Sequence, residues 1–246
     1  LRRSEHIELV GRTLEIADGR IPIVAGTGSN STDQSIELSA AVVDPRLTAY
    51  MAVVPYYNKP TQEGLYRHFC TLADTIEKPL LLYNVPGRTV ADMLPETVAR
   101  LAKHGNIFGL KEATGDIGRL KAIQALVGDE FMLYSGDDFT VLPFVEQGGH
   151  GVVTVSGNVA PRQLAELCRL AMAGKSDEAA ALDETLQALN EMLFVESNPI
   201  PVKWAVSEMG LMEPHIRLPL TPFSDEHHEA MRAAMQKAGV DPERNA

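Results

Sequence analysis

The 246-residue sequence predicts an α/β fold built on a parallel sheet, and two observations carry this prediction. Short apolar runs of β-forming residues alternate with amphipathic segments, and parallel strands need such helical crossovers between them. The runs are apolar on both faces, as the strands of a covered parallel sheet are. Six strands are expected in this way, at residues 21–25, 49–55, 80–85, 107–110, 131–135 and 151–155.

The amphipathic segments predict the helices. One is expected before the first strand, at residues 3–15, and five accompany the strands, at residues 35–43, 63–75, 94–102, 117–127 and 140–147. After residue 155 the alternation ends, and four helices are expected in succession, at residues 161–172, 176–194, 200–209 and 225–238. We therefore expect a barrel-like catalytic domain over residues 1–174 and a small C-terminal helical domain over residues 175–246.

The number of strands decides between two sheet architectures. A closed (β/α)8 TIM barrel needs eight strands, and the opening helix has no strand before it, so the chain is expected to begin inside a βα unit. An open, doubly wound sheet of six strands is the alternative. Such sheets usually carry a glycine-rich dinucleotide turn after the first strand, and residues 26–30 lack its third glycine. We therefore favour a (β/α)8 barrel that lacks its first two strands.

Composition restricts the class of function. The formal net charge of -11, the pI near 5.1 and the lack of a long basic cluster argue against nucleic acid or an anionic membrane surface as partner. No apolar run reaches the roughly 18 residues of a membrane span, and no signal-peptide core follows the first residues. Cys70 and Cys168 lie in separate helix-like segments, which favours reduced thiols in the cytoplasm. These exclusions leave small metabolites as the expected class of substrate.

Lys111 is the most informative residue, because it ends a short apolar run at residues 107–110. Strand alternation places it on the face of Gly109 and Ala113, which leave space around the amine. A lysine in such a partly desolvated place tends to lose its charge, and a neutral amine can attack a ketone to form a Schiff base. The alternative is a structural lysine that snorkels to water or pairs with a carboxylate such as Glu112.

Other reactive side chains follow the carboxyl ends of the expected strands, where parallel barrels place their chemistry. Tyr57 and Tyr83 are expected at this rim, and a phenol beside a lysine can shuttle a proton during imine formation. Arg88 lies just beyond a strand end and presents a planar fork suited to a carboxylate. Each of these residues alone is more often structural, but their convergence on one rim favours catalysis.

Six motifs, taken together and in order, resemble the 4-hydroxy-tetrahydrodipicolinate synthase (dihydrodipicolinate synthase) family of the pyruvate-dependent class I aldolase superfamily. The resemblance extends from residue 1 to about residue 240. The motifs lie at residues 55–58, 83–89, 109–115, 135–138, 148–151 and 198–204.

This resemblance implies a role for each candidate residue. Lys111 would form the Schiff base with pyruvate, Tyr83 would relay protons, and Tyr57 would reach into the site of a neighbouring subunit. Arg88 would receive the carboxylate of L-aspartate 4-semialdehyde, and the backbone at Val153 would contact the pyruvyl group. The enamine of pyruvate then adds to the aldehyde, a step of lysine and diaminopimelate biosynthesis. The resemblance implies no metal or organic cofactor, and a homotetramer built from tight dimers.

Two departures from the family pattern leave alternatives open. The Gly-Thr-Thr-Gly-Glu turn that binds the pyruvate carboxylate and completes the proton relay is absent, so a non-catalytic fragment is one alternative. A related aldolase, of the N-acetylneuraminate lyase or 2-keto-3-deoxy sugar acid type, is another. Those enzymes do not typically carry an arginine at the position of Arg88, so we rank the synthase first.

The resemblance also implies a regulatory site for lysine. His6, Asn30 and Tyr56 match positions that bind lysine in bacterial members of the family. Arg3 and Gln34 replace the residue types expected of sensitive enzymes, and a neutral glutamine is a poor partner for an ammonium. Weak or absent feedback inhibition is therefore expected.

Overall fold

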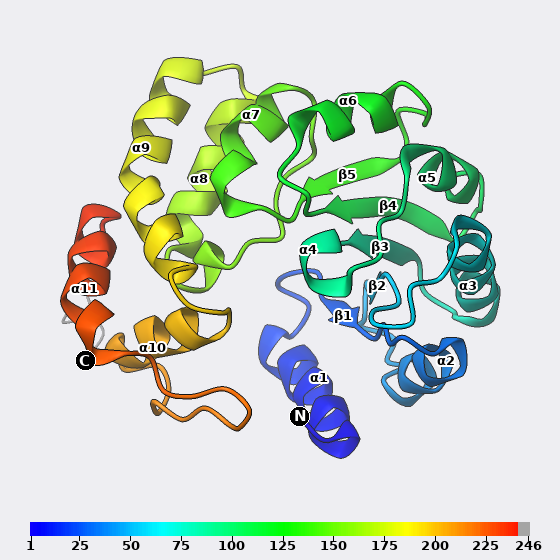
Figure 1. Ribbon diagram of the computed structural model, residues 1–246, viewed down its shortest axis with the longest axis horizontal. Coiled ribbons are helices and arrows are strands. Elements are labelled where there is room, and N and C mark those ends of the chain that lie inside the picture. The colour runs from blue at the N-terminus through cyan, green and yellow to red at the C-terminus, as the bar shows by residue number, and fades with distance from the viewer. Residues whose placement is uncertain (241–246) are drawn as a thin grey trace. The chain divides into compact units, whose positions relative to one another are not determined.

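The computed structural model describes residues 1–240 and divides the chain into two compact units (Figure 1). The first unit is Leu1–Gly136, and the second begins at Asp137. In chain order, the first unit contains α1 (Arg3–Ala17), β1 (Val24–Gly26), α2 (Thr32–Ala41), β2 (Ala49–Val53), α3 (Gln62–Thr75), β3 (Leu80–Asn84), α4 (Pro86–Thr89), α5 (Pro95–Leu101), β4 (Ile107–Glu112), α6 (Ile117–Gln124) and β5 (Met132–Ser135).

The first unit is an α/β layer with one parallel sheet, as predicted. Its strands follow the order β1-β2-β3-β4-β5, and every neighbouring pair is parallel. Right-handed crossovers in a sheet of this order place all the helices on one face, and α2, α3, α5 and α6 lie in a row beside the sheet (Figure 1). A doubly wound sheet reverses its strand order. The observed order is therefore that of a barrel-type sheet.

The prediction of a sixth strand, at residues 151–155, is wrong. Within residues 1–240 the sheet has five strands, and Val152 forms only a single bridge. The backbone turns at Gly151, whose φ is +139°. Where the expected strand ends, the N–H groups of Val155 and Ser156 donate to Asp138 Oδ2 at 2.8 and 3.3 Å. These donors are therefore not available for a strand ladder.

Helix caps explain why some helices begin where they do. The Ser31 side chain accepts a hydrogen bond from the amide of Gln34, so α2 begins three residues before the start that the apolar pattern predicted. Thr61 caps α3 in the same way, and Asp116 caps α6. A cap of this kind stabilises a helix by about 1 kcal/mol.

The second unit is helical. It contains η1 (Asp138–Thr140), α7 (Val141–Glu146), η2 (Ser156–Asn158), α8 (Pro161–Met172), α9 (Ser176–Leu193), α10 (Ile200–Glu208), η3 (Asp225–His227) and α11 (His228–Lys237). Its core gathers fully buried side chains such as Leu186, Leu189 and Met231. The four helices expected after residue 155 are confirmed to within three residues. The domain boundary at residue 174 stays a prediction, and residues 241–246 of that expected domain lie outside the described residues.

His68 on α3 predicts a measurable pH dependence of stability. Burial lowers the pKa of this histidine to about 4, and its Nδ1 lies 2.9 Å from the Thr32 hydroxyl. The unfolded chain then binds more protons between pH 6.5 and 4, so this contribution is complete above pH 6.5 and is lost as the pH falls. Lowering the pH from 7 to 5 should cost about 2 kcal/mol through this residue alone.

Denaturant unfolding of the chain and of a His68→Gln variant at pH 7 and pH 5 measures this difference. The variant should lose about 2 kcal/mol less than the parent chain over the same pH interval. Equal losses in both proteins would show that His68 is not the titrating group.

Candidate active site

Lys111 and Tyr83 lie side by side on neighbouring strands. They are register partners on β4 and β3, and Tyr134 on β5 is the next partner in the same row. Partners at one level of a parallel sheet project from the same face. Lys111 Nζ lies over the Tyr83 ring, 4.1 Å from its centroid, and the lysine is only 9% exposed. The ring face therefore shields the amine from water and, when the amine is protonated, also attracts it.

The Tyr83 phenol keeps its proton at neutral pH. Burial raises the pKa of this phenol above its usual value, and the positive charge of Arg88 opposes the rise. Arg88 lies on the single turn of α4, with its side chain exposed. That turn is fixed by Thr89, whose hydroxyl lies 2.9 Å from the carbonyl oxygen of Ala91 and 3.1 Å from that of Val85. The arginine is thus held near enough to Tyr83 for its charge to act there.

Gly136 makes room for the lysine side chain. A Cβ at this position would lie 2.7 Å from Lys111 Cε and 2.6 Å from the Ala113 Cβ. Both separations are shorter than a van der Waals contact between carbon atoms. A side chain at position 136 would therefore displace the reactive amine.

A Gly136→Ala variant tests this requirement. The added methyl group should move Lys111 away from Tyr83 and reduce the rate of imine formation with pyruvate by about 10²-fold, the cost of misplacing a reacting group by about 1 Å. Borohydride trapping at timed intervals measures the rate. Gly128→Ala is the matched control, because a Cβ there meets nothing within 4 Å and should leave the rate unchanged. Equal rates in both variants would refute the steric argument.

Tyr57 is not part of the Lys111–Tyr83 pair. Its side chain is 86% exposed, and its backbone is left-handed, with a φ of +74°. Such a conformation costs a non-glycine residue about 1 kcal/mol and therefore marks a position that the surrounding chain holds in place. The Tyr57 amide donates to the Thr89 carbonyl at 3.4 Å. The side chain is accessible to a second copy of the chain, and its role stays a prediction.

Val153 belongs to the second unit. It lies between α7 and η2, two residues before the Val155 amide that donates to Asp138. Burial raises the pKa of Asp138, and its backbone carbonyl accepts a hydrogen bond from Asn190 Nδ2 at 3.0 Å. The segment that carries Val153 is therefore fixed within its own unit.

A separate cavity of about 430 Å³ contains part of the predicted lysine site. Its lining includes His6 and Tyr56, together with Arg3, Gln34 and Glu37. Arg3 forms an ion pair with Glu37, with Nη1 2.9 Å from Oε2. Arg3 is thus paired with a carboxylate that lines the same cavity.

Asn30, the third residue of the predicted lysine site, does not line that cavity. Its backbone carbonyl accepts a hydrogen bond from Asn58 Nδ2 at 2.8 Å. The structure therefore brings His6 and Tyr56 to one cavity and places Asn30 outside its lining.

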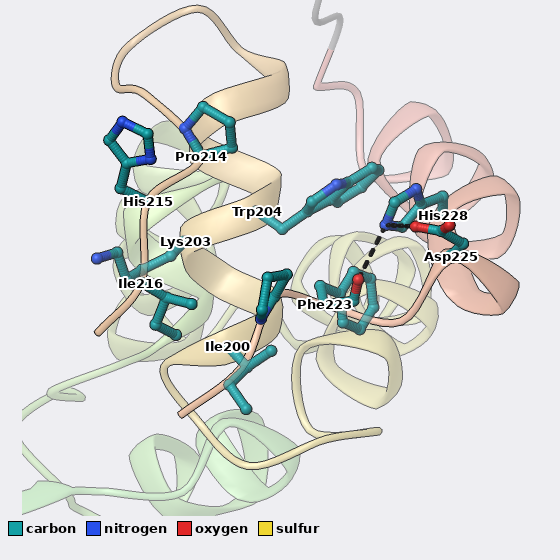
Figure 2. Close-up of a pocket in the computed structure, with 10 residues that line it drawn as sticks. Ile200, Lys203, Trp204, Pro214, His215, Ile216, Phe223, Asp225 and His228 are labelled. Carbon is teal, nitrogen blue, oxygen red and sulfur yellow. Dashed lines mark hydrogen bonds and ion pairs between the residues drawn. The ribbon is translucent and has the colours of Figure 1, made fainter. Parts of the chain in front are cut away.

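A cavity of about 270 Å³ in the second unit has a different character. It is lined mainly by apolar and aromatic side chains, among them Ile200, Trp204 and Phe223, and Figure 2 shows Lys203 turned away from the aromatic cluster. His228 stacks on Trp204 at 4.3 Å between ring centroids. His228 Nε2 lies 3.7 Å from Asp225 Oδ1, so these two polar groups of the lining are already engaged with each other.

Residues 1–240 contain neither a membrane-spanning helix nor a cluster of metal-binding side chains. None of the helices there is long and apolar enough to cross a membrane. No group of three or more His, Cys, Asp or Glu side chains in that range could hold a metal ion.

Comparison with known proteins shows close relatives over nearly the whole chain. The 4-hydroxy-tetrahydrodipicolinate synthase of Pseudomonas syringae pv. syringae is 52% identical over 237 residues, which is 96% of this chain and 81% of the relative. The structure of dihydrodipicolinate synthase from Acinetobacter baumannii complexed with pyruvate is 46% identical, with a TM-score of 0.95, and the match covers 98% of this chain and 83% of that one.

A third relative was solved with lysine bound. It is the dihydrodipicolinate synthase of Cyanidioschyzon merolae, which is 37% identical, with a TM-score of 0.93 over 98% of this chain and 82% of that one. The sequence model of the Dihydrodipicolinate synthetase family matches residues 1–238. The chain therefore belongs to the Dihydrodipicolinate synthetase family.

Proposed function

We propose that this chain is a 4-hydroxy-tetrahydrodipicolinate synthase, which condenses pyruvate, held as a Schiff base on Lys111, with L-aspartate 4-semialdehyde. It is a lyase of the Schiff-base-forming class I aldolase type. The observation that carries the proposal is the shielded amine of Lys111 over the Tyr83 ring, in a chain of this family. Relatives near 50% identity support the same reaction and not that of the sugar-acid aldolases.

The chemistry follows from these two side chains. The neutral amine of Lys111 adds to the keto carbon of pyruvate, and water leaves to give the imine. Loss of a methyl proton turns the imine into an enamine, whose carbon attacks the aldehyde of the second substrate. The Tyr83 phenol donates and recovers protons in these steps. The amino group of the adduct then attacks the imine carbon, which closes the ring and releases the lysine amine.

The remaining candidate residues bind the substrates or complete the proton relay. Arg88 receives the carboxylate of the semialdehyde, for which its exposed guanidinium at the end of β3 is suited. The backbone at Val153 contacts the pyruvyl group, and Tyr57 completes the proton relay in the site of a neighbouring subunit. We further propose that the enzyme lies in the cytoplasm as a homotetramer of tight dimers, and that its five-stranded sheet belongs to a (β/α)8 barrel followed by a helical domain.

A substrate-omission assay tests the proposed function. The chain should consume pyruvate and aspartate semialdehyde in equal amounts only when both are present, and should not cleave N-acetylneuraminate or a 2-keto-3-deoxy sugar acid. Cleavage of either sugar acid without condensation of the two proposed substrates would overturn the assignment.

Lysine at the cavity lined by His6 and Tyr56 should inhibit weakly or not at all. The neutral amide of Gln34 offers no charge to an ammonium group, and Glu37 in the same cavity is already paired with Arg3. A Gln34→Glu variant supplies the missing charge and should strengthen inhibition by lysine. Strong inhibition of the unaltered chain at low lysine concentrations would contradict this reasoning.

A further inference from the structure

A buried amide–carboxylate bridge joins the strands that carry Tyr83 and Lys111. Asn84 Nδ2 donates to Glu112 Oε2 at 3.1 Å, and the two residues are register partners on β3 and β4. Asn84 is fully buried, and Glu112 is 3% exposed. The strands are also linked by the Ala113 amide, which donates to the Asn84 carbonyl at 2.9 Å.

The bridge uses the hydrogen-bonding capacity of both side chains. Asn84 Nδ2 also donates to Asp92 Oδ1 at 2.9 Å, and Asn84 Oδ1 accepts from the Met93 amide at 3.0 Å. Glu112 Oε1 accepts from the Thr114 amide at 2.9 Å. An asparagine amide has two donor hydrogens, so Asn84 gives one to each carboxylate.

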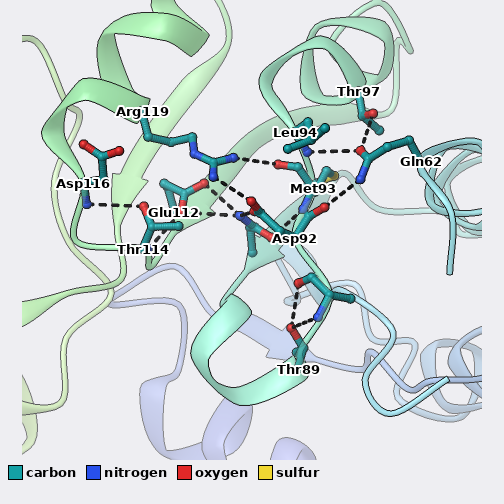
Figure 3. Close-up of polar contacts among 12 residues, drawn as sticks. Gln62, Thr89, Asp92, Met93, Leu94, Thr97, Glu112, Thr114, Asp116 and Arg119 are labelled. Carbon is teal, nitrogen blue, oxygen red and sulfur yellow. Dashed lines mark hydrogen bonds and ion pairs between the residues drawn. The ribbon is translucent and has the colours of Figure 1, made fainter. Parts of the chain in front are cut away.

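The bridge is anchored to a helix on the covered face of the sheet. Asp92 Oδ2 binds Arg119 Nη2 at 2.6 Å, and Arg119 lies on α6 (Figure 3). Side chains alternate between the two faces of a strand. Asn84 and Glu112 therefore face the helices, and Tyr83 and Lys111, one residue earlier on each strand, project from the opposite face.

Burial makes this arrangement costly for folding. Burial raises the pKa of Glu112, although bonds from Asn84 and Thr114 oppose the rise. A buried carboxylate is weak evidence for stability, because its desolvation offsets much of what its partners supply. Two leucines at positions 84 and 112 would pack between the sheet and the helices without that cost. The polar bridge therefore indicates that the two strands must be held in a defined geometry. The geometry that it fixes is the spacing of the two residues next to it, Tyr83 and Lys111.

We propose that Asn84 and Glu112 are positioning residues, which set the register and spacing of β3 and β4 so that the Tyr83 ring lies against the Lys111 amine. This inference rests on the proposed Schiff base at Lys111. The two residues do not touch the substrate, because they lie on the other face of the sheet.

Variants that change the donor and acceptor pattern without changing its shape test the proposal. Asn84→Asp replaces the shared amide by an oxygen that faces the carboxylates of Glu112 and Asp92. It should lower the rate of imine formation with pyruvate by about 10²-fold, because the reacting pair is displaced by about 1 Å. Glu112→Gln lowers the rate less, since one oxygen can still accept from Thr114.

The double variant Asn84→Asp/Glu112→Gln provides the rescue. The amide is now at position 112 and the carboxylate at position 84, so the hydrogen bond between these two positions re-forms with reversed polarity. The carboxylate at position 84 still faces Asp92, so the recovery is partial. The double variant should form the imine at least about tenfold faster than Asn84→Asp alone, which corresponds to about 1.4 kcal/mol. A general loss of stability does not predict such a recovery.

Leu14→Ala is the stability control. This buried leucine lies on α1, which carries no residue of the bridge or its anchor, and its truncation should lower the melting temperature without changing the imine rate per folded molecule. The proposal is overturned if Asn84→Asp forms the imine as fast as the parent chain, or if the double variant shows no recovery. A parent chain that forms no imine would overturn the proposed function itself, and this inference with it.

Discussion

Replacing Lys111 by alanine is expected to abolish the condensation. The side chain is the only amine that the structure places against the Tyr83 ring in residues 1–240, at 4.1 Å from the ring centroid. Without it pyruvate has no covalent anchor, and the enamine cannot form. We expect kcat to fall by at least about 10⁴-fold, the scale seen when a covalent nucleophile is removed. Steady-state consumption of both substrates measures the loss.

The control for this prediction is Lys121→Ala on α6. That lysine is exposed, so its removal should leave kcat and KM unchanged. A Lys111→Met variant, which keeps the length of the side chain but not the amine, should be as inactive as Lys111→Ala. Activity of either Lys111 variant above about one hundredth of the parent value would exclude the Schiff-base mechanism, because that loss is far smaller than removal of a nucleophile produces.

Replacing Tyr83 by phenylalanine is expected to have the next largest effect. The ring would still cover the Lys111 amine, so binding of pyruvate should change little. Proton transfer would be lost, and kcat should fall by about 10² to 10⁴-fold. The pyruvate KM should stay within about threefold of the parent value, since only an interaction of the transition state is removed.

The pH profile gives a second readout for Tyr83. Because burial raises the pKa of the phenol above its usual 10, its ionisation should not reduce activity in the parent chain below that pH. The matched control is Tyr66→Phe on α3, whose ring contacts Arg100 at the surface of the unit. An unchanged kcat in Tyr83→Phe would remove the phenol from the mechanism.

The strand pattern predicted the parallel sheet and the proximity of two candidate site residues. Apolar runs separated by helices predict the parallel order, and the rule that chemistry lies at carboxyl strand ends predicts that Tyr83 and Lys111 lie close together. The prediction of a strand at residues 151–155 failed because the valine-rich pattern does not show that Asp138 binds the amide of Val155 and that of Ser156, the next residue. Such contacts join residues that are far apart in the sequence, and the spacing of apolar residues gives no sign of them.

The features that hold the site were missed for a similar reason. The sequence suggests Glu112 as a partner of Lys111, yet its carboxylate binds Asn84 on the helix-covered face. Strand alternation predicts this, because neighbouring residues such as Lys111 and Glu112 project from opposite faces of a strand. In the sequence, Gly136 is only one residue of a motif. That this position must lack a side chain becomes clear only from the Lys111 side chain that packs against it. The place of Tyr134 beside Lys111 could not be predicted, because it depends on the register of β5 against β4.

The most direct test of the account is the position of a trapped pyruvate adduct. The parent chain is incubated with pyruvate, reduced with borohydride and digested, and the masses of the peptides are measured by mass spectrometry. We predict a stable mass increment from a reduced pyruvyl group on Lys111, and no increment in the Lys111→Ala variant. A folded chain that gives no adduct, or an adduct on a different lysine, would contradict the central claim.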